Sequence, residues 1–161
     1  MNSIQKEVGD LLRRRGLTLG LVESATGGII SGMITAVAGS SDYYQGSVTS
    51  YSNRIKRGLV GVKEETLAEN GVVSARVAEE MAQGGREVLD VDICLSDTGI
   101  AGPGGATAGK PVGLFYIGLA HEGGIFSRRC EFRGSRQQNR QAAAEAVLSW
   151  LKEYLLSLEQ G

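Results

Sequence analysis

The sequence has few of the residues that metal centres and disulfide frameworks require. Its 161 residues include one histidine and two cysteines. The lone histidine, His121, has no second histidine or cysteine near it, so no metal-ligand spacing is present and we expect no metal. Cys94 and Cys130 both fall in predicted strands, where we expect reduced, packed thiols.

Strong charge and long apolar runs are also absent. Seventeen basic and 18 acidic residues give a net charge of −1, so no overall field draws the chain to nucleic acid or to an anionic membrane. No apolar stretch approaches the roughly 18 to 20 residues of a membrane span. The N-terminal segment reads as an amphipathic helix and not as a signal peptide. We therefore expect a cytoplasmic protein with no nucleic-acid or membrane partner.

Glycine is the residue in excess. The chain has 24 glycines, about 15 %, where roughly 7 % is usual. They are clustered, which indicates tight turns or backbone that lies close to a ligand.

The hydrophobic pattern predicts one α/β domain over residues 1–161. Apolar spacing predicts helices and strands that are mixed along the chain, the last two strands forming a hairpin. Strands with covering helices indicate a three-layer α/β/α sandwich with a mixed sheet. The predicted helices are 3–15, 27–38, 64–69, 74–89 and 136–157, and the predicted strands are 17–23, 43–52, 91–98, 112–120 and 125–132.

The stretch "VESATGG", residues 22–28, joins a predicted strand to a predicted helix. A helix start leaves several backbone N–H groups unpaired and carries partial positive charge. Such a site can hold a phosphate or an oxyanion, and Ser24 would point into the same space. The N–H groups of Thr26, Gly27 and Gly28 would be the donors. The alternative is that Ser24 or Thr26 merely caps the helix.

The stretch "TSYSNRIK", residues 49–56, follows a second predicted strand. In one interpretation Asn53 is a cap and Lys56 is a solvated surface charge. In the other, Lys56 is drawn into a cleft, where desolvation favours its neutral form and makes it a general base. A Ser–Lys pair is a known form of nucleophile activation, and Tyr51 could relay the proton or hold the pair in place.

The glycine-rich stretch "DTGIAGPGGATAGKP", residues 97–111, begins where a predicted strand ends. Ligands of α/β sheets bind at such strand ends. The length and composition therefore favour a shaped binding loop over a plain surface loop.

Two arginines begin the last predicted helix. Arg136 and Arg140 are four residues apart and share a face. Two guanidinium groups on one face could bind a phosphate, although exposed helical arginines are commoner.

Taken together, these stretches resemble the C-terminal domain of the competence/damage-inducible protein CinA. The resemblance is carried, in order, by "ESATGG", "GSVTSYSNRIKRGLVGV", "NGVVSARVAEEMAQG", "TGIAGPGG" and "KPVGLFYIGLA". It implies a compact α/β/α domain, often a homo-oligomer. Stand-alone members are nicotinamide-nucleotide amidases, which convert nicotinamide mononucleotide to nicotinic acid mononucleotide and ammonia in pyridine-nucleotide salvage. The resemblance implies no cofactor and a small-molecule nucleotide as substrate.

The resemblance also assigns roles to residues. Ser24 would be the nucleophile, Tyr51 and Lys56 would activate it, and Arg136 would meet the phosphate. The glycine-rich loop would line the nucleotide pocket, and these last two roles could be exchanged. The expected substrate-binding residues are Thr26, Gly27, Gly28, Asn53, Gly99, Ile100, Ala101, Gly102, Arg136 and Arg140.

Departures from the family pattern leave these assignments in place. Ala25 stands where many relatives have cysteine, and Ser135 stands where an acidic residue is usual. Two other functions stay open: a non-catalytic nucleotide-binding or competence-associated interaction protein, and an amidase that acts on another small amide.

Overall fold

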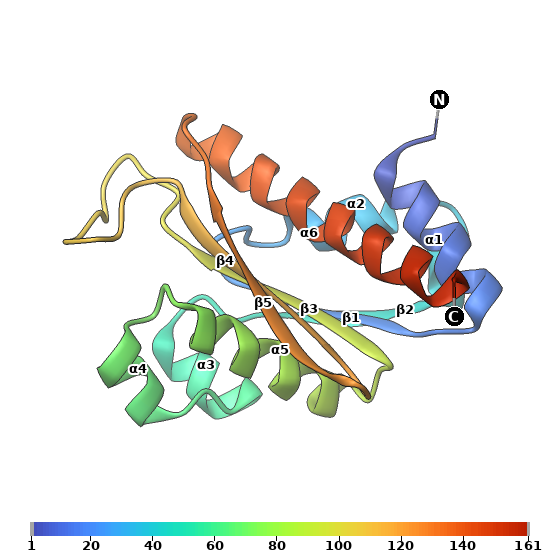
Figure 1. Cartoon of the computed structure of the whole chain (residues 1–161), viewed down its shortest axis with the longest axis horizontal. Helices are drawn as coiled ribbons and strands as arrows, with labels where there is room; N and C mark the ends of the chain where they lie inside the picture. Colours follow the sequence, from blue (N-terminus) through green and yellow to red (C-terminus); the bar gives the residue numbers. More distant parts are fainter. Residues whose placement is uncertain (1, 161) are drawn as a thin grey trace.

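The computed structural model describes residues 2–160, which form a single domain around one mixed five-stranded sheet (Figure 1). Strand β1 (Leu19–Glu23) lies parallel to both β2 (Tyr44–Thr49) and β3 (Ile93–Gly99). Strand β4 (Leu114–His121) is antiparallel to β3, and β5 (Gly124–Glu131) forms a hairpin with it. The sheet order is β2-β1-β3-β4-β5. The mixed sheet and the hairpin confirm the sequence prediction; residues 1 and 161 lie outside the described part.

Helices cover both faces of the sheet, as Figure 1 shows, and this gives the predicted three layers. A short 3₁₀ turn, η1 (Ser40–Asp42), precedes β2. One face carries α1 (Ile4–Arg15), α2 (Ile29–Thr35) and α6 (Arg136–Glu159), and the other carries α3 (Asn53–Val60), α4 (Glu64–Asn70) and α5 (Ala75–Leu89).

Strand β1 is the centre of the parallel part and is buried along its whole length. Leu21 packs in the larger core beneath α1, α2 and α6, whereas Val22 packs in the smaller core beneath α5. Because β1, β2 and β3 are parallel, their carboxyl ends at Glu23, Thr49 and Gly99 meet at one edge of the sheet. The three polar stretches singled out in the sequence therefore converge there.

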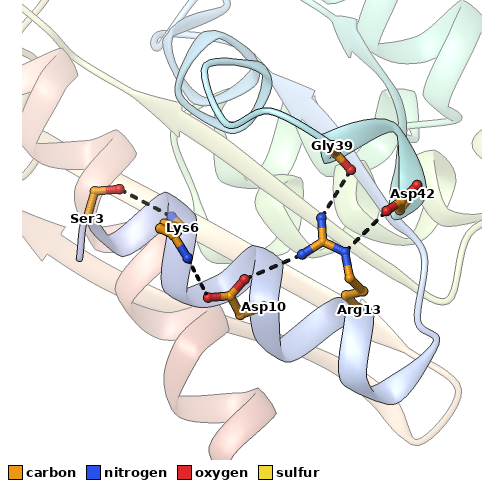
Figure 2. Close-up of polar contacts among 6 residues, drawn as sticks. All are labelled: Ser3, Lys6, Asp10, Arg13, Gly39 and Asp42. Carbon is orange, nitrogen blue, oxygen red and sulfur yellow. Dashed lines mark hydrogen bonds and ion pairs between the residues drawn. The ribbon is translucent and has the colours of Figure 1, made fainter.

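Helix α1 is attached to the turn before β2 through charged side chains, which Figure 2 shows. Lys6 lies 3.0 Å from Asp10, and the Arg13 guanidinium bridges Asp10 and Asp42. Exposed pairs of this kind contribute little free energy, so their role is to orient α1 against η1.

Helix α3 is an element that the sequence prediction missed. The predicted strand over 43–52 ends at Thr49, and a helix begins at Asn53. Ser52 is its cap, because its Oγ accepts the Ile55 N–H at 3.2 Å. The interpretation of Asn53 as the cap is therefore wrong.

The cysteines agree with their predicted state. Cys94 in β3 and Cys130 in β5 are both free. Within residues 2–160, no helix is long and apolar enough to cross a membrane. The same residues contain no group of three or more His, Cys, Asp or Glu side chains that could hold a metal ion.

Two adjacent glycines let α5 pack closely on both the sheet and α3. A Cβ at Gly85 would overlap Val22 of β1 and crowd the Cys94 Sγ, and a Cβ at Gly84 would overlap the Val60 carbonyl oxygen. The helix is continuous through both positions, so close approach explains why glycine stands inside a helical pattern.

We expect Gly84→Ala to lower the free energy of unfolding by about 1–3 kcal/mol, because the methyl group collides with backbone that cannot rotate away. Gly58→Ala is the control, since Gly58 lies on the exposed side of α3 and no atom outside its own helix backbone is within 4 Å of its Cβ position. It should be neutral or stabilising by up to about 1 kcal/mol. Urea unfolding of the two variants measures both; equal stabilities would contradict this account of the α3–α5 contact.

Candidate active site

A cavity of about 180 Å³ opens at the edge where the parallel strands end. Its lining comes from the turn after β1, the segment after β2 with the start of α3, the connection between α4 and α5, the end of β3 and the start of α6. All of these segments except the α4–α5 connection contribute polar or charged side chains. They are Ser24, Tyr51, Asn53, Lys56, Thr98 and Arg136.

Lys56 and Ser24 form the centre of this cavity. Lys56 is only 1 % exposed, and its Nζ lies 2.9 Å from the Ser24 Oγ. The same Nζ donates to the carbonyl oxygens of Ser50, at 2.7 Å, and Tyr51, at 3.2 Å. Two hydrogens are thus directed at carbonyl groups, and the remaining position of the nitrogen faces the serine hydroxyl.

Burial favours the neutral form of this amine. Desolvation lowers the pKa of Lys56 from 10.5 to about 8, and the charge of Asp97 opposes the change. A neutral lysine has a lone pair in place of its third hydrogen, and at Lys56 that lone pair would face Ser24. The pair can therefore act as nucleophile and base. The interpretation of Lys56 as a solvated surface charge is wrong.

The start of α2 is capped by a residue that the sequence analysis did not consider. The fully buried Glu23 carboxylate accepts the N–H groups of Gly28, Ile30 and Ser31 at 2.9–3.1 Å. Gly28 is the N-cap position and has no side-chain cap. Neither Ser24 nor Thr26 caps the helix, because the Glu23 carboxyl group already accepts the N–H groups at its start.

The N–H groups expected to bind an oxyanion already donate hydrogen bonds within the protein. The N–H groups of Thr26, Gly27 and Gly28 each donate to a carboxylate or a turn carbonyl. None of these three residues lines the cavity, and their role in substrate binding stays a prediction. Ala25 does line it, and its N–H makes no hydrogen bond with another residue in the range 2–160. The N–H of the residue after a nucleophile is a common oxyanion donor.

Asp97 is a second buried acid that the sequence analysis did not assign. Its carboxyl group accepts the N–H of Ser24 at 3.2 Å and that of Thr26 at 3.1 Å. Burial raises the pKa of Asp97 from 3.8 to about 6, although these hydrogen bonds act in the opposite direction. An acidic residue inside the otherwise uncharged strand "ICLSDTG" is the sequence signal that could have identified it.

Tyr51 does not lie between Ser24 and Lys56. Its side chain is 64 % exposed, and its hydroxyl accepts from the Arg136 guanidinium at 3.3 Å. The expected proton relay through this hydroxyl is therefore not formed; the Tyr51 carbonyl is the group that holds Lys56. Arg136 also donates to the Gly102 carbonyl at 2.8 Å, which fixes its guanidinium at the rim.

Arg140 has a different position from its neighbour on α6. It donates to the carbonyl oxygens of Ala25, at 3.0 Å, and Thr26, at 3.1 Å. Arg140 does not line the cavity. In this position it holds the turn that carries Ser24, and its role in substrate binding stays a prediction.

A second cavity of about 400 Å³ continues outward from the first, and the two share Arg136 in their lining. The glycine-rich connection between β3 and β4, which extends beyond the sheet in Figure 1, forms one wall. Its lining residues include the predicted Gly99, Ile100, Ala101 and Gly102. This connection is therefore not a plain surface loop.

Lys110 brings a positive charge to the outer cavity that the sequence analysis missed. Its Nζ donates to the Asn70 carbonyl at 2.6 Å. The side chain thereby joins the glycine-rich connection to the end of α4. The sequence signal for it is the lysine of "GKP", a basic residue inside a glycine-rich loop that was expected to bind a ligand.

The chain is similar over nearly its whole length to proteins of one family. A family model described as the CinA C-terminal domain matches residues 1–155. The CinA-like protein of Geobacter sp. (strain M21) is 50% identical over 148 residues, which are 91% of this chain and 36% of that protein. The CinA-like protein of Geobacter metallireducens is 44% identical over 155 residues, which are 96% and 38% of the two chains. This chain thus spans little more than a third of these curated relatives.

Solved structures share the fold. The CinA superfamily protein of Klebsiella pneumoniae superposes with a TM-score of 0.92 at 30% identity, over 96% of both chains. The competence/damage inducible protein CihA of Agrobacterium tumefaciens has a TM-score of 0.86 at 32% identity, over 94% of this chain and 95% of its own.

The buried acid makes stability depend on pH. Because the pKa of Asp97 is raised on folding from 3.8 to about 6, the folded chain binds this proton more tightly than the unfolded chain. The resulting stabilisation is complete below pH 3.8 and is lost as the pH rises through about 6. It corresponds to about 3 kcal/mol.

We expect Asp97→Asn to become more stable relative to the wild type by up to about that amount between about pH 4 and pH 8, measured by urea unfolding at each pH. The same change at exposed Asp92, at the opposite end of β3, should follow the wild-type curve. A constant difference between Asp97→Asn and wild type would contradict the assignment.

Proposed function

This chain belongs to the CinA C-terminal domain family, and we propose that it is an amidase that hydrolyses the carboxamide of nicotinamide mononucleotide. The products would be nicotinic acid mononucleotide and ammonia. The observation that carries the proposal is the buried Lys56 amine, 2.9 Å from the Ser24 hydroxyl inside a cavity. A nucleophile beside a desolvated base is the arrangement that covalent acyl transfer requires.

In the first half of the reaction, the Ser24 Oγ attacks the amide carbon while neutral Lys56 takes the hydroxyl proton. The carbonyl oxygen of the substrate becomes an oxyanion, and the Ala25 N–H is the donor nearest the nucleophile in sequence. One such donor contributes about 3 kcal/mol in comparable sites. The Lys56 ammonium then returns the proton to the amide nitrogen, the C–N bond breaks, and ammonia leaves.

The second half uses the same base. The acyl group is now an ester of Ser24, and a water molecule attacks it while Lys56 accepts the proton of that water. Collapse of the intermediate breaks the bond to Ser24, which regains its proton from Lys56. The free carboxylic acid is released, and no cofactor takes part.

The two connected cavities suit a substrate with an amide head and an anionic tail. The inner cavity of about 180 Å³ has room for the carboxamide end, and the outer one of about 400 Å³ for a ribose phosphate. Arg136 stands between them and Lys110 lines the outer one. Both are cationic donors of the kind that bind phosphate.

We expect Ser24→Ala and Lys56→Met each to lower ammonia release from nicotinamide mononucleotide by about 10³-fold or more, because each removes one member of a pair that acts as a unit. Ser127→Ala and Lys6→Ala, both on remote surfaces, are the matched controls.

In the wild type, we expect kcat/KM to rise with pH until the pKa of Lys56, about 8, is passed, since only the neutral amine accepts a proton.

Two results would reject parts of this proposal. Turnover that survives in folded Ser24→Ala and Lys56→Met would show that the pair is not catalytic. A folded wild-type protein that releases no ammonia would reject the substrate and shift the assignment to another amide or to a binding role.

We expect Lys110→Ala to raise KM for nicotinamide mononucleotide by about tenfold with little change in kcat, because it removes a charge that contacts only the tail. The same variant should not change kcat/KM for nicotinamide riboside, which lacks the phosphate. An equal loss for both substrates would mean that Lys110 acts by ordering the loop and not by binding phosphate.

A further inference from the structure

Beneath Ser24, two buried carboxyl groups share one hydroxyl. The Thr26 Oγ1 lies 2.7 Å from the Glu23 Oε1 and 2.5 Å from the Asp97 Oδ2. A threonine hydroxyl has a single hydrogen to donate. The Thr26 hydroxyl can therefore donate to only one of the two carboxyl groups. The second carboxyl group must itself be protonated, so that it can donate to the Thr26 Oγ1.

The surroundings of the two acids decide which one carries that proton. Glu23 also accepts three backbone N–H groups at the start of α2, which stabilise its negative charge. Asp97 is fully buried and accepts only two, from Ser24 and Thr26. Asp97 is therefore the group that binds a proton, which it donates to the Thr26 Oγ1, while Thr26 donates to Glu23.

The same Asp97 oxygen is linked to the nucleophile. Its Oδ2 accepts the Ser24 N–H at 3.2 Å, and the Ser24 Oγ lies 2.9 Å from the Lys56 Nζ. A negative charge on Asp97 raises the pKa of Lys56, against the effect of burial. The other charged groups at this turn are Glu23, already bonded to α2, and Arg140, whose guanidinium binds turn carbonyls on the α6 side.

We propose that Asp97 is a positioning residue of this site: it holds the Ser24 turn to β3 and, by binding or releasing its own proton, sets how readily Lys56 becomes a neutral base. Ionised Asp97 strengthens the hold of Lys56 on its proton, and protonated Asp97 weakens it. This inference deepens the proposed function and rests on it for the role of Lys56 as base.

Asp97→Asn tests the proposal because asparagine has the shape of the protonated acid. Its Nδ2 can donate to the Thr26 Oγ1 and its Oδ1 can accept the Thr26 N–H. The Nδ2 cannot accept the Ser24 N–H, as the Asp97 Oδ2 does, and the side chain carries no charge at any pH. The protonation midpoint of Lys56 can be followed by NMR of ¹³C-labelled lysine during a pH titration, and Lys56→Met identifies the signal. This measurement needs no substrate.

We expect the Lys56 midpoint to fall by about one pH unit or more in Asp97→Asn, and the rising limb of kcat/KM to move to lower pH by the same amount. Asp92→Asn, the same change at the far end of β3, should move neither. A merely structural role for Asp97 would lower activity at all pH values without displacing the limb.

An unchanged Lys56 midpoint in folded Asp97→Asn would overturn the proposal. If that variant does not fold, Asp97→Thr removes the charge with a residue suited to a strand, and the same shift is expected. A displaced midpoint in a protein without amidase activity would support the role of Asp97 while rejecting the proposed function.

Discussion

The Glu23 carboxylate lies fully buried at the end of β1 and accepts three backbone N–H groups from the start of α2. A buried carboxylate is costly unless it is paired or well hydrogen-bonded, and the helix start supplies both donors and partial positive charge. This contact bends the chain sharply between strand and helix and leaves Ser24 at the turn. The helix start thereby serves the architecture of the turn.

Two further contacts complete the turn from opposite sides. Asp97 accepts N–H groups of the turn from within the sheet, and Arg140 donates to its carbonyl oxygens from α6. The backbone around Ser24 is therefore held by an acidic and a basic side chain together. Such a rigid surrounding is what keeps a catalytic side chain within reach of its base.

The position of Lys56 depends on helix α3, which the sequence prediction missed and which places this lysine in a buried site. Ser52 starts this helix immediately after β2, and one turn later Lys56 points back under the strand ends. Burial then lowers its pKa, while the carbonyl groups after β2 keep its orientation. An amine on an exposed strand end would keep the ordinary lysine pKa of 10.5, so at neutral pH a far smaller fraction of it would be in the neutral form that can accept a proton.

The sequence by itself determined the layers of the fold and indicated a candidate nucleophile–base pair. Apolar periodicity gave nearly all helices and strands, since burial on one face is a local property of the pattern, and the resemblance to one family pointed to Ser24 and Lys56. Only the tertiary structure decided the roles of Asp97, Arg140 and Lys110. Hydrogen bonds between residues 70 or more positions apart, such as those of Asp97 with Ser24 and Thr26, leave no spacing signal in the sequence, because they form only when distant segments are brought together by the core.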